Sequence, residues 1–381
     1  MTSMDVVELT RALIRAQSPT GRESSAARTL AAALVDLGYD QVEIDAAGNV
    51  IGELLRGDGP TLMLNGHIDT VPAGDASLWP HPPFEAALEG GRIYGRGACD
   101  MKGAVAAMAL AGRAAADDDG VAGRIVMTGV VQEEIGGLGA RYLASQRSAD
   151  VIVLGEPSDL RLMLGHRGRC EVQAVFPGAM AHAGRAALGR NALSRAARFV
   201  RALEELELPS VDPVGRASAT PTSLVTYPRD GTNVVPGSAE LAIDYRSVPG
   251  ETIDSVIARL SALDPEARFS VPEERFASED GAVEMRMPRE NRPYLLDPDH
   301  PAVAVAVGAL SDALGRPVQV DTWWFATDAP HLASLGAPII GFGPGNPELA
   351  HTSGEYVEVE QLEQAVVAYR ALIAALMGGC A

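Results

Sequence analysis

Short apolar runs, each followed by glycine or a polar residue, alternate with helical patterns along much of the chain. The runs lie at Thr61–Leu64, Arg124–Val131, Val151–Leu154 and Pro338–Phe342. Runs of this length predict buried strands, and the helical pattern at Lys102–Ala116 predicts a helix that covers them, as in an α/β sheet. Residues 5–38 show helical periodicity that turn residues interrupt at Ser18–Gly21, so we expect two helices there.

The pattern changes near Arg169, where Cys170–Phe176 alternates like a half-exposed strand. The elements expected beyond it are a helix at Asn191–Leu206, a strand at Ser238–Arg246, a helix at Thr252–Leu263 and a strand around Ala267–Arg275. The first pattern resumes near Arg292 and includes a helix at Pro301–Leu314. We therefore expect an α/β catalytic domain with a central, mostly parallel sheet, made of residues 1–169 and 292–381. A smaller α+β domain at residues 170–291 is expected to be inserted into it.

The length of 381 residues also exceeds what one hydrophobic core usually holds, which favours two domains. Lysine and arginine total 31 against 50 aspartates and glutamates, and this net charge of -19 disfavours nucleic acid and anionic membranes as partners. No apolar stretch reaches transmembrane length, and the N-terminus lacks the features of a signal peptide. With only three cysteines, Cys99, Cys170 and Cys380, we expect a cytoplasmic protein with unpaired thiols.

Histidines and acidic residues follow the ends of the predicted strands, where an open α/β sheet forms its ligand crevice. They are His67, Asp69, Asp100, Glu133, Glu134, Glu156 and His351. Two imidazoles and the carboxylates of Asp100, Glu134 and Glu156 can complete two zinc shells of about four ligands only if one carboxylate bridges. Asp100 lies in a glycine-bounded loop at the start of a helix and is the natural bridge.

Two further carboxylates are not needed as ligands. Asp69 lies two residues after His67 in extended chain, on the same side, where it can orient the imidazole. Glu133 is left free, as a general base requires. Two metal ions that acidify water and polarise a carbonyl would complete a machinery for amide hydrolysis. We expect two Zn²⁺ per subunit, with Co²⁺ or Mn²⁺ as alternatives in a mixed imidazole and carboxylate site.

At these residues the chain resembles the family of dinuclear zinc amidohydrolases and peptidases that includes acetylornithine deacetylase, succinyl-diaminopimelate desuccinylase and aminoacylase. The motifs that carry the resemblance are Gly66–Asp69, Gly95–Gly103, Glu133-Glu134, Gly155–Ser158 and Ala350-His351, spread over essentially the full length. The resemblance implies a zinc-peptidase-like catalytic domain. It also implies that His67, Asp100 and Glu156 hold one zinc, that Asp100, Glu134 and His351 hold the other, and that the Asp100-Met101 peptide is cis.

The same resemblance assigns roles in the smaller domain, as a lid that forms a homodimer. His182 corresponds to a histidine that reaches a partner subunit's active site and steadies the oxyanion, although Ala186 replaces a usual proline nearby. Asn233 and Arg246 would touch the substrate. Because a guanidinium can bind a carboxylate through two parallel hydrogen bonds, Arg246 implies a small-molecule substrate with a free carboxylate.

The sequence thus predicts a zinc-dependent amidohydrolase that removes the acyl group from a small N-acyl amino acid. A dipeptidase or carboxypeptidase with the same site is the main alternative. A metal-binding protein without catalysis is a second, which Glu133 argues against, and an aminohydrolase that releases ammonia is a third. The remaining histidines, among them His166 at the domain joint, are expected to serve packing or the surface, and the tryptophans Trp323 and Trp324 are expected to pack in the core.

Overall fold

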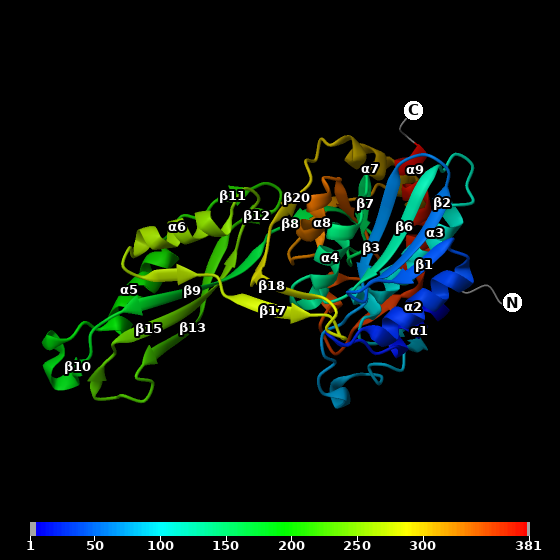
Figure 1. Cartoon of the computed structure of the whole chain (residues 1–381). Coiled ribbons are helices and arrows are strands. Elements are labelled where there is room, and N and C mark those ends of the chain that lie inside the picture. The colour runs from blue at the N-terminus through cyan, green and yellow to red at the C-terminus, as the bar shows by residue number, and fades with distance from the viewer. Residues whose placement is uncertain (1–4, 379–381) are drawn as a thin grey trace.

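The computed structural model describes residues 5–378 and shows a larger lobe and a smaller lobe (Figure 1). A nine-stranded sheet forms the centre of the larger lobe, in the order β1-β2-β6-β3-β7-β22-β8-β20, with β21 beside β8. The strands are β1 (Gln41–Ile44), β2 (Val50–Arg56), β3 (Thr61–His67), β6 (Gly123–Val130), β7 (Val151–Leu154), β8 (Leu162–His166), β20 (Tyr294–Leu295), β21 (Val320–Trp323) and β22 (Ile339–Gly341).

The centre of this sheet is parallel, and its flanks are antiparallel except for β21, which runs parallel to β8. Strands β6, β3, β7 and β22 run parallel, whereas β1 pairs antiparallel with β2, β2 with β6, and β8 with both β22 and β20. Helix α3 (Gly103–Ala115) connects β3 to its parallel neighbour β6, helix α4 (Leu138–Gln146) connects β6 to β7 on the other side of β3, and a short turn joins β1 and β2. The expected parallel strands are therefore central, and the sheet as a whole is mixed.

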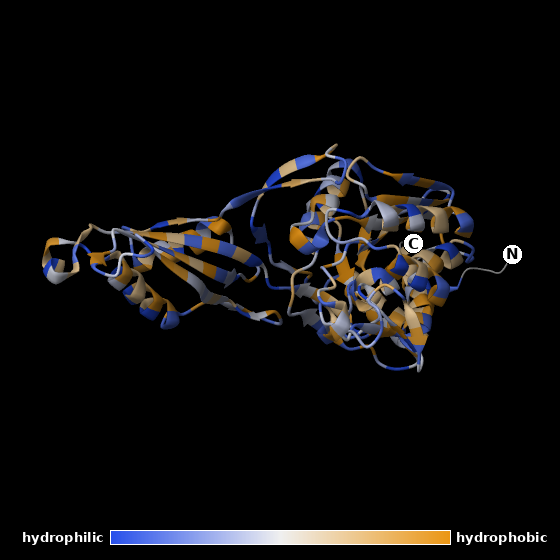
Figure 2. Cartoon of the chain, turned by 90° about the horizontal axis from the view of Figure 1, so that it is seen from below, coloured by the Kyte–Doolittle hydropathy of each residue, from blue (hydrophilic) through white to orange (hydrophobic). Residues whose placement is uncertain are grey.

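Helices cover both faces of the sheet. One face packs against α1 (Val6–Arg15), α2 (Ser24–Leu37), α3, α7 (Pro301–Leu314) and α9 (Val359–Gly378). The other face packs against α4 and α8 (Ala329–Leu332). In Figure 2 the strands between these layers are largely hydrophobic, as expected for a sheet covered on both sides. Every helix among residues 5–378 is too short or too polar to span a lipid bilayer.

The smaller lobe is an antiparallel sheet with two helices. Its strands follow the order β13 (Ser218–Tyr227), β15 (Ser238–Arg246), β9 (Arg169–Pro177) and β16 (Arg268–Ser270), and β19 (Glu290–Asn291) also pairs with β9. Helices α5 (Ala192–Glu204) and α6 (Ile253–Leu263) cover the face that carries Phe176, Leu241 and Ile243. The lobe therefore has a hydrophobic core of its own.

One hairpin between β16 and β19 returns to the larger lobe. It consists of β17 (Glu273–Ala277) and β18 (Glu284–Pro288), and its Phe276 and Met287 are buried in the core of the larger lobe. The expected strand around 267–275 is divided into β16 and β17 at Val271-Pro272, since proline lacks the N–H that a continuous strand would donate. The division at residues 170 and 291 stays a prediction, and this hairpin is the part of the segment that packs outside the smaller lobe.

The remaining elements are short. They are β4 (Ala87–Glu89), β5 (Arg92–Tyr94) and β23 (Tyr356–Glu358) in one sheet, β10 (Ala181–His182) with β14 (Val234–Val235), β11 (Ser210–Val211) with β12 (Gly215–Arg216), and the helical turns Ala76–Leu78, Ala98–Lys102, Glu133–Ile135, Ala183–Leu188, Ala333–Leu335 and Pro347–Leu349. Trp323 is buried, but Trp324 is 63% exposed, so its expected packing role is wrong. Cys99 and Cys170 are buried free thiols, and Cys380 lies outside the described residues.

Candidate metal centre

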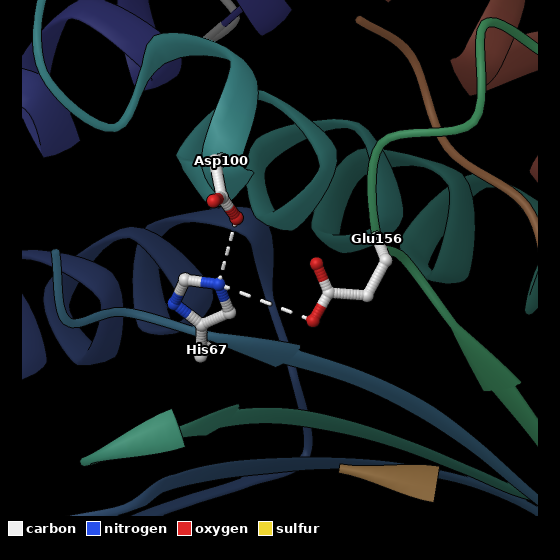
Figure 3. A group of neighbouring side chains, drawn as sticks. All are labelled: His67, Asp100 and Glu156. Atoms are coloured by element: carbon white, nitrogen blue, oxygen red, sulfur yellow. Dashed lines mark hydrogen bonds and ion pairs between the residues drawn. The ribbon is translucent and has the colours of Figure 1, made fainter. Parts of the chain in front are cut away.

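The turns that follow the central strands bring the first group of expected ligands together. His67 is the last residue of β3, and Glu156 follows β7. Nε2 of His67 lies 3.0 Å from Oδ1 of Asp100 and 4.0 Å from Oε1 of Glu156 (Figure 3). These side chains point toward one another, and their ligand atoms lie within 4.8 Å of one another.

A second group shares Asp100 with the first. Nε2 of His351 lies 3.2 Å from Oδ2 of Asp100 and 3.0 Å from Oε2 of Glu134. The structure therefore brings all five expected ligands into two clusters, and each oxygen of Asp100 faces one of the two imidazoles. This is the arrangement that a bridging carboxylate requires.

The electrostatics of the clusters fit cations. Burial raises the pKa of the Glu133, Glu134 and Glu156 carboxyls, and neighbouring carboxylates raise it further. Hydrogen bonds with Asp100 and Glu134 raise the pKa of His351 to about 10. So many buried carboxylates require positive charge among them, and divalent ions held by these nitrogen and oxygen donors would supply it. The donor set therefore fits two metal ions that share Asp100.

The loop that carries Asp100 is fixed from behind by Glu355. One oxygen of the Glu355 carboxylate accepts hydrogen bonds from the backbone N–H groups of Cys99 at 3.0 Å and Asp100 at 3.2 Å, and the other accepts from Arg96 at 2.5 Å. Burial raises the pKa of Glu355 to about 7, although Arg96 opposes the shift. The expected cis peptide between Asp100 and Met101 is present in the same loop.

Sequence reasoning missed Glu355. It is a fully buried acid directly before β23, four residues after His351 along the chain. The spacing from a ligand histidine was the available signal, but its partners are backbone groups more than 250 residues away, which the sequence pattern does not show.

Asp69 links the two sides of the centre. Its backbone oxygen lies 3.0 Å from Nδ1 of His67, and Oδ1 of its carboxylate lies 3.5 Å from the same nitrogen. The two carboxylate oxygens also accept hydrogen bonds from the backbone N–H groups of Glu133 and Glu134, at 3.1 and 3.3 Å. Asp69 thus orients the imidazole and also holds the turn that carries the two glutamates.

Glu133 belongs to neither ligand cluster but lines the cavity beside them. This cavity of about 470 Å³ lies between the lobes and is also lined by Glu134, His351 and Arg246. A carboxylate free of ligand duty next to the clusters is placed as a general base would be. Arg246, from the end of β15, brings a guanidinium to the opposite wall.

His182 and Asn233 lie away from this cavity. His182 ends β10, which Figure 1 shows at the end of the smaller lobe that is farthest from the larger lobe. Its Nδ1 accepts a hydrogen bond from the backbone of Gly184, and the backbone oxygen of Asn233 accepts one from Ala183. A single chain therefore does not bring them to the centre, and their role in a partner's site stays a prediction.

Other buried polar residues surround the centre. Within residues 5–378, neither carboxylate oxygen of the buried Asp328 has a hydrogen-bond partner, and burial raises its pKa to about 7. Lys102 donates to the backbone oxygens of Leu13 and Ala16, and burial lowers its pKa to about 7. His166 packs in the interior, where Nε2 accepts from the backbone of Thr327. Sequence reasoning did not single out Asp328 or Lys102, because nothing in their local pattern marks them as buried.

The comparisons with known proteins point to one family. A family model described as Peptidase family M20/M25/M40 matches residues 63–375. The uncharacterized protein YgeY of Escherichia coli is 29% identical over 97% of this chain and 93% of its own length. Succinyl-diaminopimelate desuccinylase of Alkalilimnicola ehrlichii is 28% identical over 98% of this chain and its entire length. The fold also matches the YXEP protein of Bacillus subtilis, described as a dinuclear metal binding peptidase, with a TM-score of 0.72, 15% identity and 97% coverage of both chains.

Proposed function

From the premise that this chain belongs to Peptidase family M20/M25/M40 and is a hydrolase, we propose that it cleaves the amide bond of a small N-acyl amino acid. The observation that carries the proposal is the position of Asp100 in both ligand clusters, with Glu133 free beside them. The full-length similarity to a desuccinylase supports a deacylase. Zinc suits the nitrogen and oxygen donors, and cobalt or manganese could replace it.

In the proposed reaction, different residues of the chain have different roles. Bound divalent metal ions would supply Lewis acidity, which acidifies water and polarises the scissile carbonyl. The Glu133 carboxylate takes a proton from the attacking water and returns it to the leaving amine. Burial raises the pKa of Glu133, which makes its protonated form a usable acid for the second transfer. Arg246 binds the free carboxylate of the substrate, and this sets the position of the scissile bond in the cavity.

A homodimer would complete the site. In this proposal His182 of one subunit enters the other subunit's cavity and donates a hydrogen bond to the developing oxyanion, while Asn233 contacts the substrate. The exposure of His182 at the tip of the smaller lobe, outside its own cavity, supports a role in trans. Mixing inactive Glu133→Gln chains with inactive His182→Ala chains tests it. Restored activity in the mixed dimer supports the arrangement, and a monomer in light scattering contradicts it.

A dipeptidase or carboxypeptidase is the second candidate, favoured by the peptidase described among the structural neighbours. Turnover of N-acetyl, N-succinyl and N-formyl amino acids, measured beside dipeptides on metal-loaded protein, separates the two. We expect the acyl compounds to be cleaved faster, and faster cleavage of dipeptides would replace the proposal by its alternative.

The acidic charge and the buried thiols of Cys99 and Cys170 support a cytoplasmic location.

A further inference from the structure

The wall of the cavity opposite the ligand clusters carries two arginines from neighbouring strands. In the antiparallel register Tyr245 of β15 lies opposite Cys170 of β9, so the next step places Arg246 opposite Arg169. Both side chains line the same cavity as Glu134 and His351. Like charges directly opposite each other on a sheet are destabilising, so this pair requires a compensating anion.

Asp244 provides part of that compensation. Its Oδ2 accepts a hydrogen bond from Nε of Arg169 at 2.8 Å, and its Oδ1 accepts one from Nε of Arg246 at 2.7 Å. Burial opposes ionisation of Asp244, but the two guanidinium groups hold the pKa of its carboxyl below the usual range. The Asp244 carboxylate thus binds each of the two guanidinium groups through its Nε and fixes the orientation of both.

The terminal nitrogens of both arginines are free to bind a ligand. Within residues 5–378, Arg169 and Arg246 make no hydrogen bond through them. Their side chains are 54% and 33% exposed. Arg289, on the same wall, differs: its Nε donates to Glu274 and its Nη1 to both oxygens of Glu171. Arg289 is therefore outweighed by the two carboxylates of Glu171 and Glu274, whereas Arg169 and Arg246 share the single carboxylate of Asp244.

We propose that Arg169 is a specificity-determining residue, which completes with Arg246 a clamp for one carboxylate of the substrate. The inference rests on the proposed amide hydrolysis and adds Arg169 to it. One substrate carboxylate on the cavity side, together with Asp244 on the other, balances the two guanidinium groups. Two planar forks held at fixed orientation also select a carboxylate over a neutral amide, because the amide can satisfy neither the charge nor all the donors.

The test compares the best N-acyl amino acid of the substrate panel with its carboxamide, by release of the acyl group. The wild-type protein should prefer the acid. Arg169→Ser should reduce the ratio of kcat/KM for acid over amide by roughly tenfold, through KM for the acid, as expected for loss of one charge-assisted hydrogen-bonding group. Arg169→Lys should restore only part of the ratio, because an ammonium lacks the fork.

Arg201→Ser is the matched control, since Arg201 lies in α5 of the same lobe, is 75% exposed and is remote from the cavity. Thermal unfolding checks that each variant is folded. If the ratio of kcat/KM for acid over amide is unchanged in Arg169→Ser but lost in Arg246→Ser, the inference is overturned.

If no compound is cleaved, calorimetric binding of the acid and its carboxamide decides. A preference for the acid that is lost in Arg169→Ser then upholds the clamp while the proposed function fails, and equal binding of the two compounds overturns the clamp.

Discussion

The two walls of the cavity are built differently. On the larger lobe His67 ends β3 and Glu156 follows β7, and their side chains are only 1% and 3% exposed, whereas His351 of the same centre is 53% exposed. On the smaller lobe Arg169 and Arg246 stand on a sheet with its own core and keep 54% and 33% of their side chains exposed. Under the proposed function, the chemistry would depend mainly on buried groups fixed from several sides, whereas substrate selection would depend on exposed groups that can be exchanged at little cost to the fold.

Removing the proposed general base, Glu133, should have the largest effect. Glu133→Gln keeps the shape of the side chain but cannot accept a proton, so turnover should fall by about a thousandfold. Metal content, measured by mass spectrometry, should stay at the wild-type value because Glu133 belongs to neither ligand cluster. Wild-type turnover in this variant would remove the general-base assignment.

Loosening the support behind Asp100 should have the next largest effect. Glu355→Gln replaces the carboxylate that accepts from the backbone of Cys99 and Asp100 and pairs with Arg96. Metal affinity, measured by competition with a chelator, should fall roughly tenfold to a hundredfold, as for other residues that orient metal ligands. Glu348→Gln, an exposed glutamate in the same segment, is the control. Equal affinities of the two variants would show that Glu355 does not position the loop.

The buried His166, where the lobes join, should make the fold sensitive to acid. Burial lowers its pKa to about 4 from 6.5, so the folded state binds this proton only at lower pH than the unfolded state does. Its contribution is complete above pH 6.5 and is lost as the pH falls toward 4. Between pH 7 and 5 the wild type should lose about 2 kcal/mol more of its free energy of unfolding than His166→Gln. Equal losses in urea denaturation would show that His166 is not buried in its neutral form.

The contact between the hairpin and α2 should have the smallest effect. Glu279 accepts hydrogen bonds from the backbone N–H and the hydroxyl of Ser24, at 2.8 and 3.1 Å, at the start of α2. Because the contact is exposed, Glu279→Gln should lower the free energy of unfolding by less than about 1 kcal/mol. A larger loss of the free energy of unfolding would mean that this polar contact, and not only the apolar contacts of the hairpin, holds the hairpin on the larger lobe.

The sequence predicted the buried wall better than the exposed one, for physical reasons. Each expected ligand lies near the end of a strand or near the start of a helix, and periodicity reveals these positions. The ends of parallel strands also lie at a common edge of the sheet. The antiparallel flanks of the sheet, the return of the β17–β18 hairpin and the contacts of Glu355 depend on pairings between distant segments. Local pattern does not contain these pairings, and the same holds for the hydrogen bond between Arg169 and the distant Asp244.

The number of metal ions held by defined variants tests the central claim, that Asp100 is shared by two metal sites. Mass spectrometry of the desalted, metal-loaded protein should find two ions per chain in the wild type and one each in His67→Ala and His351→Ala. In Asp100→Asn both should be lost or strongly weakened. A wild type that holds one ion, or an Asp100→Asn variant that keeps both, would contradict the account.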